Sequence, residues 1–428
     1  MNMFFIFFLF PFSLGIKIIK IPFEVKPNNL VKSDDLLSEL YNVDFYTKIK
    51  IGSKKQEIQI PFKLHRFPTY LAGKTTEIKG TKFDESLSLT YSQLDSEIFK
   101  PREDEFFEGM KSKDNIYLND IKIENFKFIL STKQNYEESG AIGLKFSSLS
   151  SEKDKLKGFN LISQLKEKEQ IDNYYFSFKF KNKDKNKGEL IIGEAPHEYD
   201  SYYNKEKFVN SNLMKSDYDI RWYIKFSEVK IGNESYSKTD ICDIKLSVGL
   251  LEGPFSFQQE IKKKFFNREG CIEENESKFS YFSCEKKVNI KEFQDLTFTL
   301  QNKEMNFTLT YEDLFIEKNG KYYFVILFNF DVHMWSFGYL FLKKYQTIFN
   351  TDKQTVSWYN EPEKKVNIVS ILLIICIIFA IIIGLLLSYI FIYKPLRVQR
   401  KKRANELIEE FDYTPTLDNN NRESKLEI

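Results

Sequence analysis

The stretch IQIPFKLHRFPTY, Ile58–Tyr70, begins as an apolar, strand-like run that ends in a Lys63-Leu64 step. A second stretch, CDIKLSVGLLEGP at Cys242–Pro254, repeats the arrangement with Lys245-Leu246. Short apolar runs bounded by polar residues are typical of strands, so each Lys-Leu step stands at a strand end. Two matching strand ends so far apart in the chain require a common structural cause.

A second, weaker sequence similarity lies downstream of each Lys-Leu step. GAIGLKF at Gly140–Phe146 and WSFGYLF at Trp335–Phe341 share a pattern of two hydrophobic residues followed by glycine. Two lobes built alike explain both repeats. The chain has 428 residues, which is enough for two packed units or one large bilobal one.

Between Tyr41 and Phe349 the pattern is mostly short alternating runs separated by charged or Asn/Asp/Gly-rich turns, which is typical of an all-β domain. Apolar residues at helical spacing predict one exception, a surface helix within 158–171. The clearest predicted strands are Phe45–Gly52, Ser86–Tyr91, Tyr175–Lys181 and Phe324–Phe330.

A charged interruption, KNKDKNKG at Lys181–Gly188, predicts the boundary between the lobes, which we place at 16–185 and 186–360. The alternative is a hairpin tip within one sheet. The 63 basic and 61 acidic residues give a formal net charge of +2. This balance creates no long-range electrostatic field that recruits nucleic acid, so we expect no nucleic-acid partner. We also expect no metal and no other cofactor.

The N-terminal residues Met3–Leu14 (MFFIFFLFPFSL) are almost wholly apolar and lead into a small-x-small pattern at 13–15. This segment is short for a membrane span, and we predict a signal peptide at residues 1–15. It lacks a basic n-region, and the alternative is a buried N-terminal strand. The next segment, IKIIKIPF at Ile16–Phe23, is either part of a removed propeptide or a permanent first strand.

Near the C-terminus, Ile368–Tyr393 contains no charged residue and is long enough to span a bilayer, so we predict a transmembrane helix at 366–393. The positive-inside rule then places the tail, 394–428, in the cytosol and the bulk of a type I protein in the lumen or outside. The cations that follow the span are Lys394, Arg397, Arg400, Lys401, Lys402 and Arg403, against Lys364 and Lys365 before it.

Three Asn-x-Ser/Thr sequons and four cysteines fit a secretory protein. The sequons all precede the predicted span, which predicts glycosylation at Asn233, Asn275 and Asn306. Cys271 and Cys284 are placed to close a short disulfide loop in an oxidising compartment. Cys376 lies within the span, and Cys242 is either a buried thiol or pairs outside the chain.

Taken in order, these pieces resemble the pepsin-type (A1) aspartic proteases over about Tyr41 to Trp358. The resemblance implies a bilobal all-β fold with few short helices and is carried by the ordered set of motifs. In the first lobe, FYTKIKIGSKKQEIQIPF resembles the opening strand and hairpin, LSLTY the flap strand with Tyr91 as the flap tyrosine, and SGAIGLKF the support of the first catalytic loop. NLISQL resembles the helix and YFSFKF the strand that follow this support, and GELIIGE resembles the G-x-L-x-x-G-G turn. In the second lobe, WYIKFSEVKIGNE resembles the opening strands, LLEGP the run after the second catalytic triad, and FGYLFLKKYQTIFNTDKQTVSW the ending.

The resemblance fails where the family's chemistry lies. Counting from the flanking glycine motifs, the two catalytic aspartates fall on Lys63 and Lys245, and the triads become Lys-Leu-His65 and Lys-Leu-Ser247. No D-T-G or D-S-G occurs anywhere in the chain. An aspartic protease needs two carboxylates that share a proton, whereas lysine, with a pKa around 10.4, cannot accept a proton from water until it loses its own. Two adjacent ammonium groups also repel each other, which lowers at least one pKa or turns the side chains apart.

Other residues offer partial substitutes for the dyad. Asp243 shares a strand face with Lys245, but Glu57 is the only acid between Gly52 and Tyr70. A Ser247 nucleophile activated by Lys245 is chemically conceivable, although nothing marks an oxyanion hole.

The two lysines allow two interpretations. Each is either a solvated strand-end residue or part of a cleft with cationic walls for an acidic peptide or another anion. His65 and Arg66 would add to such a cleft or lie on the surface. Tyr91 either covers a bound chain or packs across strands.

The sequence therefore predicts a type I membrane glycoprotein of pepsin-like fold that has lost catalysis and binds a peptide or protein in or near the old cleft. The candidate binding residues are Tyr91, His65 and Ser247. One alternative is an active endopeptidase with a non-standard site. Another is a structural or trafficking partner that uses an outer surface, and the tail is available to cytosolic adaptors.

Overall fold

The computed structural model describes residues 17–27, 40–66, 68–100, 107–134, 137–145, 156, 158–181, 186–214, 221–276, 279–330, 333–360 and 368–412. The chain divides into a compact unit, Met1–Asn360, and a second unit, Glu361–Ile428, which we describe separately. The predicted signal peptide and the tail beyond residue 412 lie outside the described residues.

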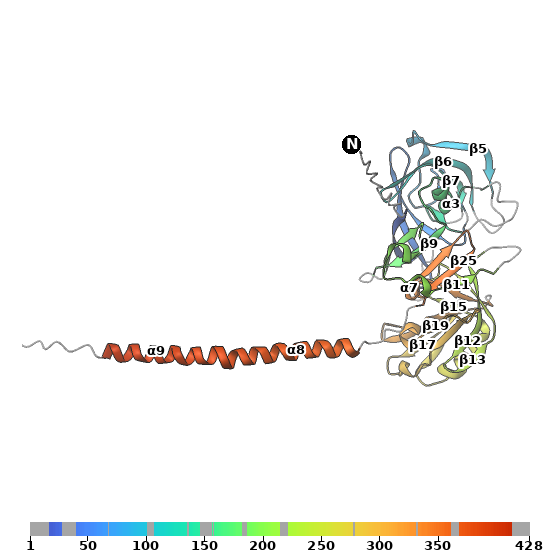
Figure 1. Cartoon of the computed structure of the whole chain (residues 1–428). Helices are drawn as coiled ribbons and strands as arrows, with labels where there is room; N and C mark the ends of the chain where they lie inside the picture. The colour runs from blue at the N-terminus through green and yellow to red at the C-terminus, as the bar shows by residue number, and fades with distance from the viewer. Residues whose placement is uncertain are drawn as a thin grey trace, which may run out of the picture. The chain divides into compact units, whose positions relative to one another are not determined.

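The compact unit is built from two β-sheets (Figure 1). Among the described residues, the first sheet has 13 strands, in the order β11-β25-β24-β9-β10-β1-β2-β3-β8-β4-β7-β6-β5. The second has 12, in the order β19-β18-β12-β14-β23-β15-β22-β17-β21-β20, with β13 on β12 and β16 on β17. The all-β, bilobal fold predicted from the sequence is confirmed.

The strands of the first sheet are β1 (Ile19–Pro27), β2 (Val43–Ile51), β3 (Gln56–Lys63), β4 (Tyr70–Ala72), β5 (Ser92–Phe99), β6 (Phe107–Leu118), β7 (Ile121–Gln134), β8 (Gly140–Gly143), β9 (Tyr175–Phe180), β10 (Lys187–Ile192), β11 (Phe208–Asn212), β24 (Thr347–Asn350) and β25 (Thr355–Tyr359). Those of the second are β12 (Tyr223–Ile231), β13 (Glu234–Ser237), β14 (Asp240–Ile244), β15 (Leu251–Gly253), β16 (Cys271–Glu276), β17 (Phe279–Glu285), β18 (Leu296–Leu300), β19 (Asn306–Leu309), β20 (Phe315–Lys318), β21 (Lys321–Phe324), β22 (Ile326–Asn329) and β23 (Trp335–Phe337). The helices of this unit are short: α3 (Leu161–Glu167), α4 (Pro196–Tyr199), α5 (Phe255–Ile261), α6 (Tyr311–Leu314) and α7 (Tyr339–Lys344), with single turns η1 (Glu85–Leu87), η2 (Lys205–Lys207), η3 (Lys262–Phe266) and η4 (Ile290–Glu292).

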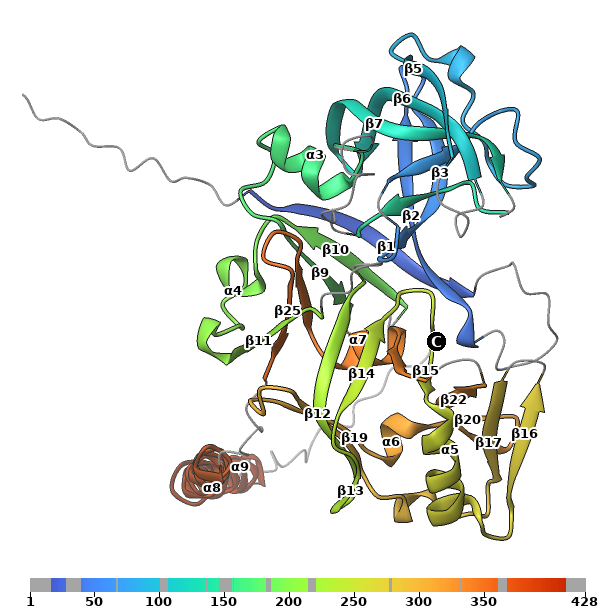
Figure 2. The ribbon, with the colours of Figure 1, turned by 90° about the vertical axis from the view of Figure 1, so that its right-hand side faces the viewer.

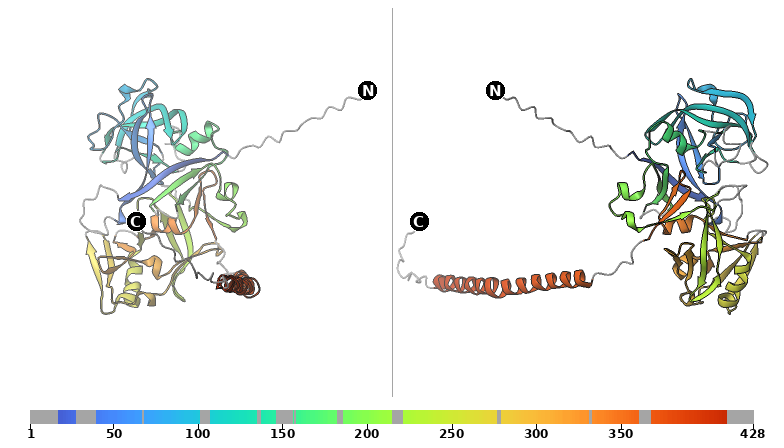
Figure 3. Two further views of the ribbon diagram at one scale, coloured as in Figure 1. Left: turned by 90° about the vertical axis from the view of Figure 1, so that its left-hand side faces the viewer. Right: turned by 45° about the vertical axis from the view of Figure 1, so that its right-hand side comes forward.

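One strand arrangement occurs twice. In the first lobe, β3 pairs in parallel with β8, β8 pairs antiparallel with β4, and β4 pairs in parallel with β7. In the second lobe, β14, β23, β15 and β22 are connected in the same way. The sequence similarity between Gly140–Phe146 and Trp335–Phe341 thus marks β8 and β23, the central strands of the two arrangements. Figure 2 shows the two lobes one above the other, and Figure 3 shows them from two further sides.

The lobes are joined by strands from distant parts of the chain. β24 pairs with β9 and β25 pairs with β11, so the end of the compact unit closes the sheet that its beginning opens (Figure 2). Aromatic side chains fill the junction: Phe176 stacks on Phe349 with ring centroids 4.8 Å apart, and Trp222 meets Phe349 edge-on, also at 4.8 Å. β9 and β10 pair as a hairpin across the predicted boundary at residues 185 and 186, so that division passes through a shared sheet.

Local hydrogen bonds change two of the predicted elements. Ser86–Tyr91 is not a strand, because Asp84 accepts a hydrogen bond from the Ser86 N–H and begins the turn η1, while Leu89 is 92 % exposed. Serine and aspartate side chains that bond to nearby backbone compete with a sheet ladder in this way. Phe324–Phe330 is interrupted at Val325, whose N–H donates to Leu314 instead of a partner strand.

Other predicted elements agree with the structure. The predicted helix is α3, which Asn160 caps by accepting from the N–H groups of Ile162 and Ser163. Ile19–Phe23 lies in β1, which pairs with both β10 and β2, as the first-strand alternative predicts.

The second unit is one helical segment made of α8 (Ile368–Ser388), the π-helical turn η5 (Tyr389–Tyr393) and α9 (Lys394–Asp412). A stretch within it, Cys376–Ile408, is long and apolar enough to be a candidate membrane span. Its described side chains are exposed along this whole stretch, as expected of a helix whose partner is lipid.

The aromatic cluster at the junction gives a stability prediction. Phe178 is 2 % exposed and its ring contacts those of Phe23, Phe45 and Phe349. We expect Phe178→Ala to lower the free energy of unfolding of the compact unit by about 3–5 kcal/mol, because it removes buried apolar surface and leaves a cavity. Urea unfolding measures this, with the exposed Leu89→Ala as the control that changes little. Equal stability of the two variants would contradict the assigned core.

Candidate functional site

Strand pairing places Lys63 and Lys245 at equivalent positions of the repeated arrangement. Lys63 ends β3, and its carbonyl oxygen accepts from the N–H of Leu144, 2.9 Å away, just beyond β8. Lys245 follows β14, and its N–H donates to the carbonyl of Phe337 at the end of β23, at 3.0 Å. The shared Lys-Leu step is thus the same turn in two copies of one motif.

Lys63 is buried between two carboxylates. Its Nζ lies 2.6 Å from Oδ1 of Asp44 and 2.9 Å from Oε1 of Glu138. The three side chains are 6 %, 0 % and 6 % exposed, so the triad is sealed from solvent. Asp44 lies on β2, beside β3, and Glu138 lies in the loop before β8, whose end pairs with Lys63. The Tyr70 hydroxyl also donates to Glu138, at 3.1 Å.

The triad sets the ionisation of its members. Burial opposes the charge on Lys63, but the Asp44 and Glu138 carboxylates outweigh it and hold the pKa of Lys63 above its usual value. Burial raises the pKa of Asp44 to about 6, and Glu138 adds to that rise while Lys63 opposes it. The two shifts have different causes: the carboxylates hold the proton on Lys63, whereas burial, with the Glu138 charge, raises the pKa of Asp44 against the opposing effect of Lys63.

Lys245 has its own carboxylate. Its Nζ donates to Oε2 of Glu252, on β15, at 2.8 Å, and the Tyr41 hydroxyl donates to the other oxygen of Glu252. Glu252 is 2 % exposed and Lys245 is 28 % exposed. Burial raises the pKa of Glu252, but Lys245 outweighs it and the pKa is lowered overall. Burial, with the Glu252 charge, raises the pKa of Tyr41 far above its usual value.

A pocket of ≈ 320 Å³ opens between the two Lys-Leu turns. Its lining includes Lys245 but, among the described residues, not Lys63. Each lysine is thus paired with carboxylates of its own lobe, and among the described residues Lys245 reaches the pocket whereas Lys63 does not. The lining residues are Tyr41, Asn42, Leu64, His65, Arg221, Trp222, Asp243, Ile244, Lys245, Ser247 and Val248.

Two of the three predicted binding residues line this pocket. His65 and Ser247 do, and both have solvent-accessible surface. Tyr91 does not belong to the described lining: it is half-buried, its hydroxyl lies 3.1 Å from Ser112 Oγ, and its ring packs 6.1 Å from that of Phe83. In this structure Tyr91 is a packing residue of the first lobe.

The pocket lining also contains two opposite charges, those of Asp243 and Arg221. Asp243 is 4 % exposed and its Oδ2 lies 3.9 Å from Nη1 of Arg221. Arg66 is buried, with its guanidinium 5.2 Å from the Tyr70 ring centroid, so it is not a surface residue. Within the described residues no cluster of three or more His, Cys, Asp or Glu side chains is arranged to hold a metal ion.

Sequence reasoning missed Asp44, Glu138 and Glu252, the partners of the two lysines. A signal existed for two of them, because Asp44 in VDFY and Glu252 in LLEGP are single acids within apolar strand segments. Acids in such positions are buried, and buried acids are almost always paired. Glu138 carries no such signal, because it lies in a polar loop.

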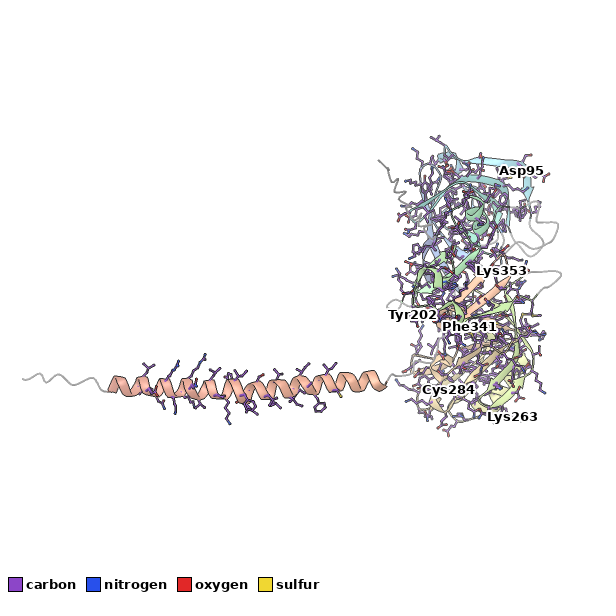
Figure 4. The ribbon with its side chains drawn as sticks, viewed as in Figure 1. Asp95, Tyr202, Lys263, Cys284, Phe341 and Lys353 are labelled. Carbon is purple, nitrogen blue, oxygen red and sulfur yellow. A yellow bond between two sulfur atoms is a disulfide. The ribbon has the colours of Figure 1, made fainter. Side chains whose placement is uncertain are left out.

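The cysteines and the sequon asparagines do not belong to the described lining of this pocket. Cys271 and Cys284 face each other on β16 and β17 and form a disulfide (Figure 4 labels Cys284). Cys242 is a fully buried thiol, and burial raises its pKa well above the usual value. The three sequon asparagines, Asn233, Asn275 and Asn306, are exposed on the second lobe.

Comparisons with known proteins agree with this fold. The family model for eukaryotic aspartyl proteases matches residues 44–360, and this chain belongs to that family. A relative named vacuolar protease A, from Arthroderma otae, is 22 % identical over 311 residues, which cover 70 % of this chain and 71 % of the relative.

The buried triad makes Lys63 a stability residue. We expect Lys63→Met to lower the free energy of unfolding by about 3–5 kcal/mol, because it leaves two buried carboxylates without their cation. Chemical denaturation at pH 7 measures the change. The matched control is Lys122→Met, which breaks the exposed pair with Glu124 and should change stability by less than about 1 kcal/mol. A small effect of both would show that Lys63 is not paired as described.

Asp44 predicts a pH dependence of stability. Its pKa is about 6 in the folded state against 3.8 in the unfolded reference, so the folded state binds more protons between these values. Stability from this group is therefore complete below about pH 4 and lost as pH rises through 6. We expect the stability difference between wild type and Asp44→Asn to change by on the order of 2 kcal/mol between pH 4 and pH 7, in favour of wild type at the acidic end. A difference that does not vary with pH would contradict the shift.

Proposed function

We propose that this protein is a membrane-anchored member of its family that does not perform aspartic protease chemistry and instead binds a peptide or protein segment in or near the pocket between the lobes. One observation carries the proposal: Lys63 and Lys245, which the resemblance matches to the family's two catalytic aspartates, each form an ion pair with a buried carboxylate.

The chemistry supports this proposal. Aspartic proteolysis uses one carboxylate to take a proton from water and a second to donate one to the substrate carbonyl. Asp44 and Glu138 are carboxylates near the first position, but with 0 % and 6 % exposure they cannot meet a substrate. Asp243 is the one carboxylate of the described pocket lining, and a single carboxylate cannot play both parts.

A serine nucleophile is also poorly supported. Lys245 donates to Glu252, and within the described residues no hydrogen bond joins it to Ser247. A general base must lie within hydrogen-bond reach of the proton that it removes. We therefore assign Ser247 the role of a binding group and not that of a nucleophile.

The anchoring part of the proposal rests on the second unit. Within the helix that holds the candidate span, the uncharged part ends at Tyr393 and six basic residues follow between Lys394 and Arg403, which supports a cytosolic tail and a lumenal or extracellular compact unit. The exposed sequon asparagines and the Cys271–Cys284 disulfide support the same orientation. The tail beyond the helix would be available to cytosolic adaptors.

Family membership favours one alternative, an active endopeptidase with a non-standard site. A second alternative is a partner that binds through an outer surface. Leu89, Leu94 and Ile98 on and before the edge strand β5 are 92 %, 40 % and 54 % exposed and form a surface for such a contact.

A turnover assay separates proteolysis from binding. We expect the purified chain to leave reduced, carboxymethylated casein intact from pH 3 to 8 while an active aspartic protease cleaves it under the same conditions. Cleavage that disappears in a Lys63/Lys245 double variant would establish the endopeptidase instead.

A binding assay separates the pocket from the outer surface. We expect fluorescent casein to bind the wild-type chain, with affinity reduced about tenfold or more by Ser247→Trp, because the large side chain fills the pocket. Leu89→Ser should have no effect. The opposite pattern would move the binding site to the edge of the first sheet.

A further inference from the structure

The pocket beside Lys245 offers hydrogen-bond donors at one end. Within the described residues, the Lys245 ammonium donates to Glu252 alone, which leaves two of its three N–H groups for a ligand. Its side chain is 28 % exposed and lines the pocket, whereas Glu252 does not. The Ser247 hydroxyl also lines the pocket and makes no hydrogen bond among the described residues. Asp243, the one carboxylate of the described lining, has the Arg221 guanidinium 3.9 Å away, so the donors of Lys245 and Ser247 remain suited to an anionic oxygen ligand.

The surroundings of the pocket are positive. Desolvation within the pocket and the cations Arg66, Lys63, Arg221 and Lys145 together lower the pKa of His65 to about 3, so the imidazole is neutral at physiological pH. Arg221 lines the pocket with a side chain that is 44 % exposed. A concave site near several cations raises the local concentration of anions.

Part of the pocket wall is apolar. Leu64, Trp222, Ile244 and Val248 line the pocket, and each is at most 4 % exposed. The volume of ≈ 320 Å³ is at the lower end of ligand pockets, which suits one or two amino-acid residues rather than a long chain. The ligand therefore needs a compact apolar group next to an anion.

We propose that this pocket binds the C-terminal end of a peptide: the terminal carboxylate accepts from Lys245 and Ser247, and an apolar last side chain contacts the wall around Leu64 and Val248. This inference rests on the proposed binding function and names its ligand chemistry. It also gives the lysine at the second catalytic position a role, because an aspartate there would repel the same carboxylate.

A matched pair of peptides tests the inference on the full-length chain in lipid nanodiscs. The probes are fluorescent Ala-Ala-Leu-Leu with a free C-terminal carboxylate and the same peptide as its C-terminal amide, and fluorescence anisotropy measures the dissociation constants. We expect the acid to bind at least about tenfold more tightly than the amide, because it gains charge-assisted hydrogen bonds. The preference should shrink as NaCl is raised.

Two variants assign the preference to the pocket. The double variant Lys245→Met/Glu252→Gln removes the ammonium together with its buried partner, so no lone charge is left behind, and it should abolish the preference for the acid. The control double variant Lys286→Met/Glu317→Gln removes an exposed ion pair of the same lobe and should keep it. Ser247→Ala, which buries no charge, should weaken acid binding severalfold and tests the site even where the double variant does not fold.

The outcomes distinguish this inference from the proposed function. Equal affinity for acid and amide in wild type, or a preference that survives both Ser247→Ala and the Lys245/Glu252 change, overturns the carboxylate site. If neither peptide binds but casein does, the carboxylate site is overturned and cleft binding stands. If neither peptide nor casein binds, both proposals fail.

Discussion

The structure depends on a simple electrostatic constraint: an ammonium group can be buried only with a carboxylate beside it. Asp44 and Glu138 meet this constraint around Lys63, and Glu252 meets it beside Lys245. Each carboxylate comes from a strand or loop next to the lysine with which it pairs. The pepsin-like fold therefore accommodates both lysines with carboxylate partners among the described residues.

This pairing within each lobe affects which interactions join the two lobes. In an aspartic protease two carboxylates share a proton across the boundary between the lobes, so the site belongs to both. Here the described charges at the two positions are balanced within each lobe, and the lobes are joined by strand pairing and by the rings of Phe176, Trp222 and Phe349. The strand pairing and ring contacts that join the lobes are thus separate from the ion pairs of the two lysines.

The two lysines are nevertheless unequal. Lys63 has two carboxylates and is sealed, whereas Lys245 has one and reaches the pocket. A matched pair of residues in the sequence has thus become a structural ion triad on one side and a ligand-facing cation on the other. This asymmetry makes a one-ended ligand such as a terminal carboxylate more suitable than a symmetric one.

The sequence by itself determined the fold class, the two-lobe repeat, the candidate membrane span and the equivalence of Lys63 and Lys245, because these depend on apolar periodicity and on the order of local motifs. Only the tertiary structure decided which acids neutralise the lysines and which lysine faces the pocket. Asp44 lies 19 residues from Lys63 and Glu138 lies 75 residues away, and only the pairing of β3 with β2 and β8 brings them together. Charge pairing across a sheet depends on the register between strands that are far apart in the chain, and this register cannot be predicted from local sequence.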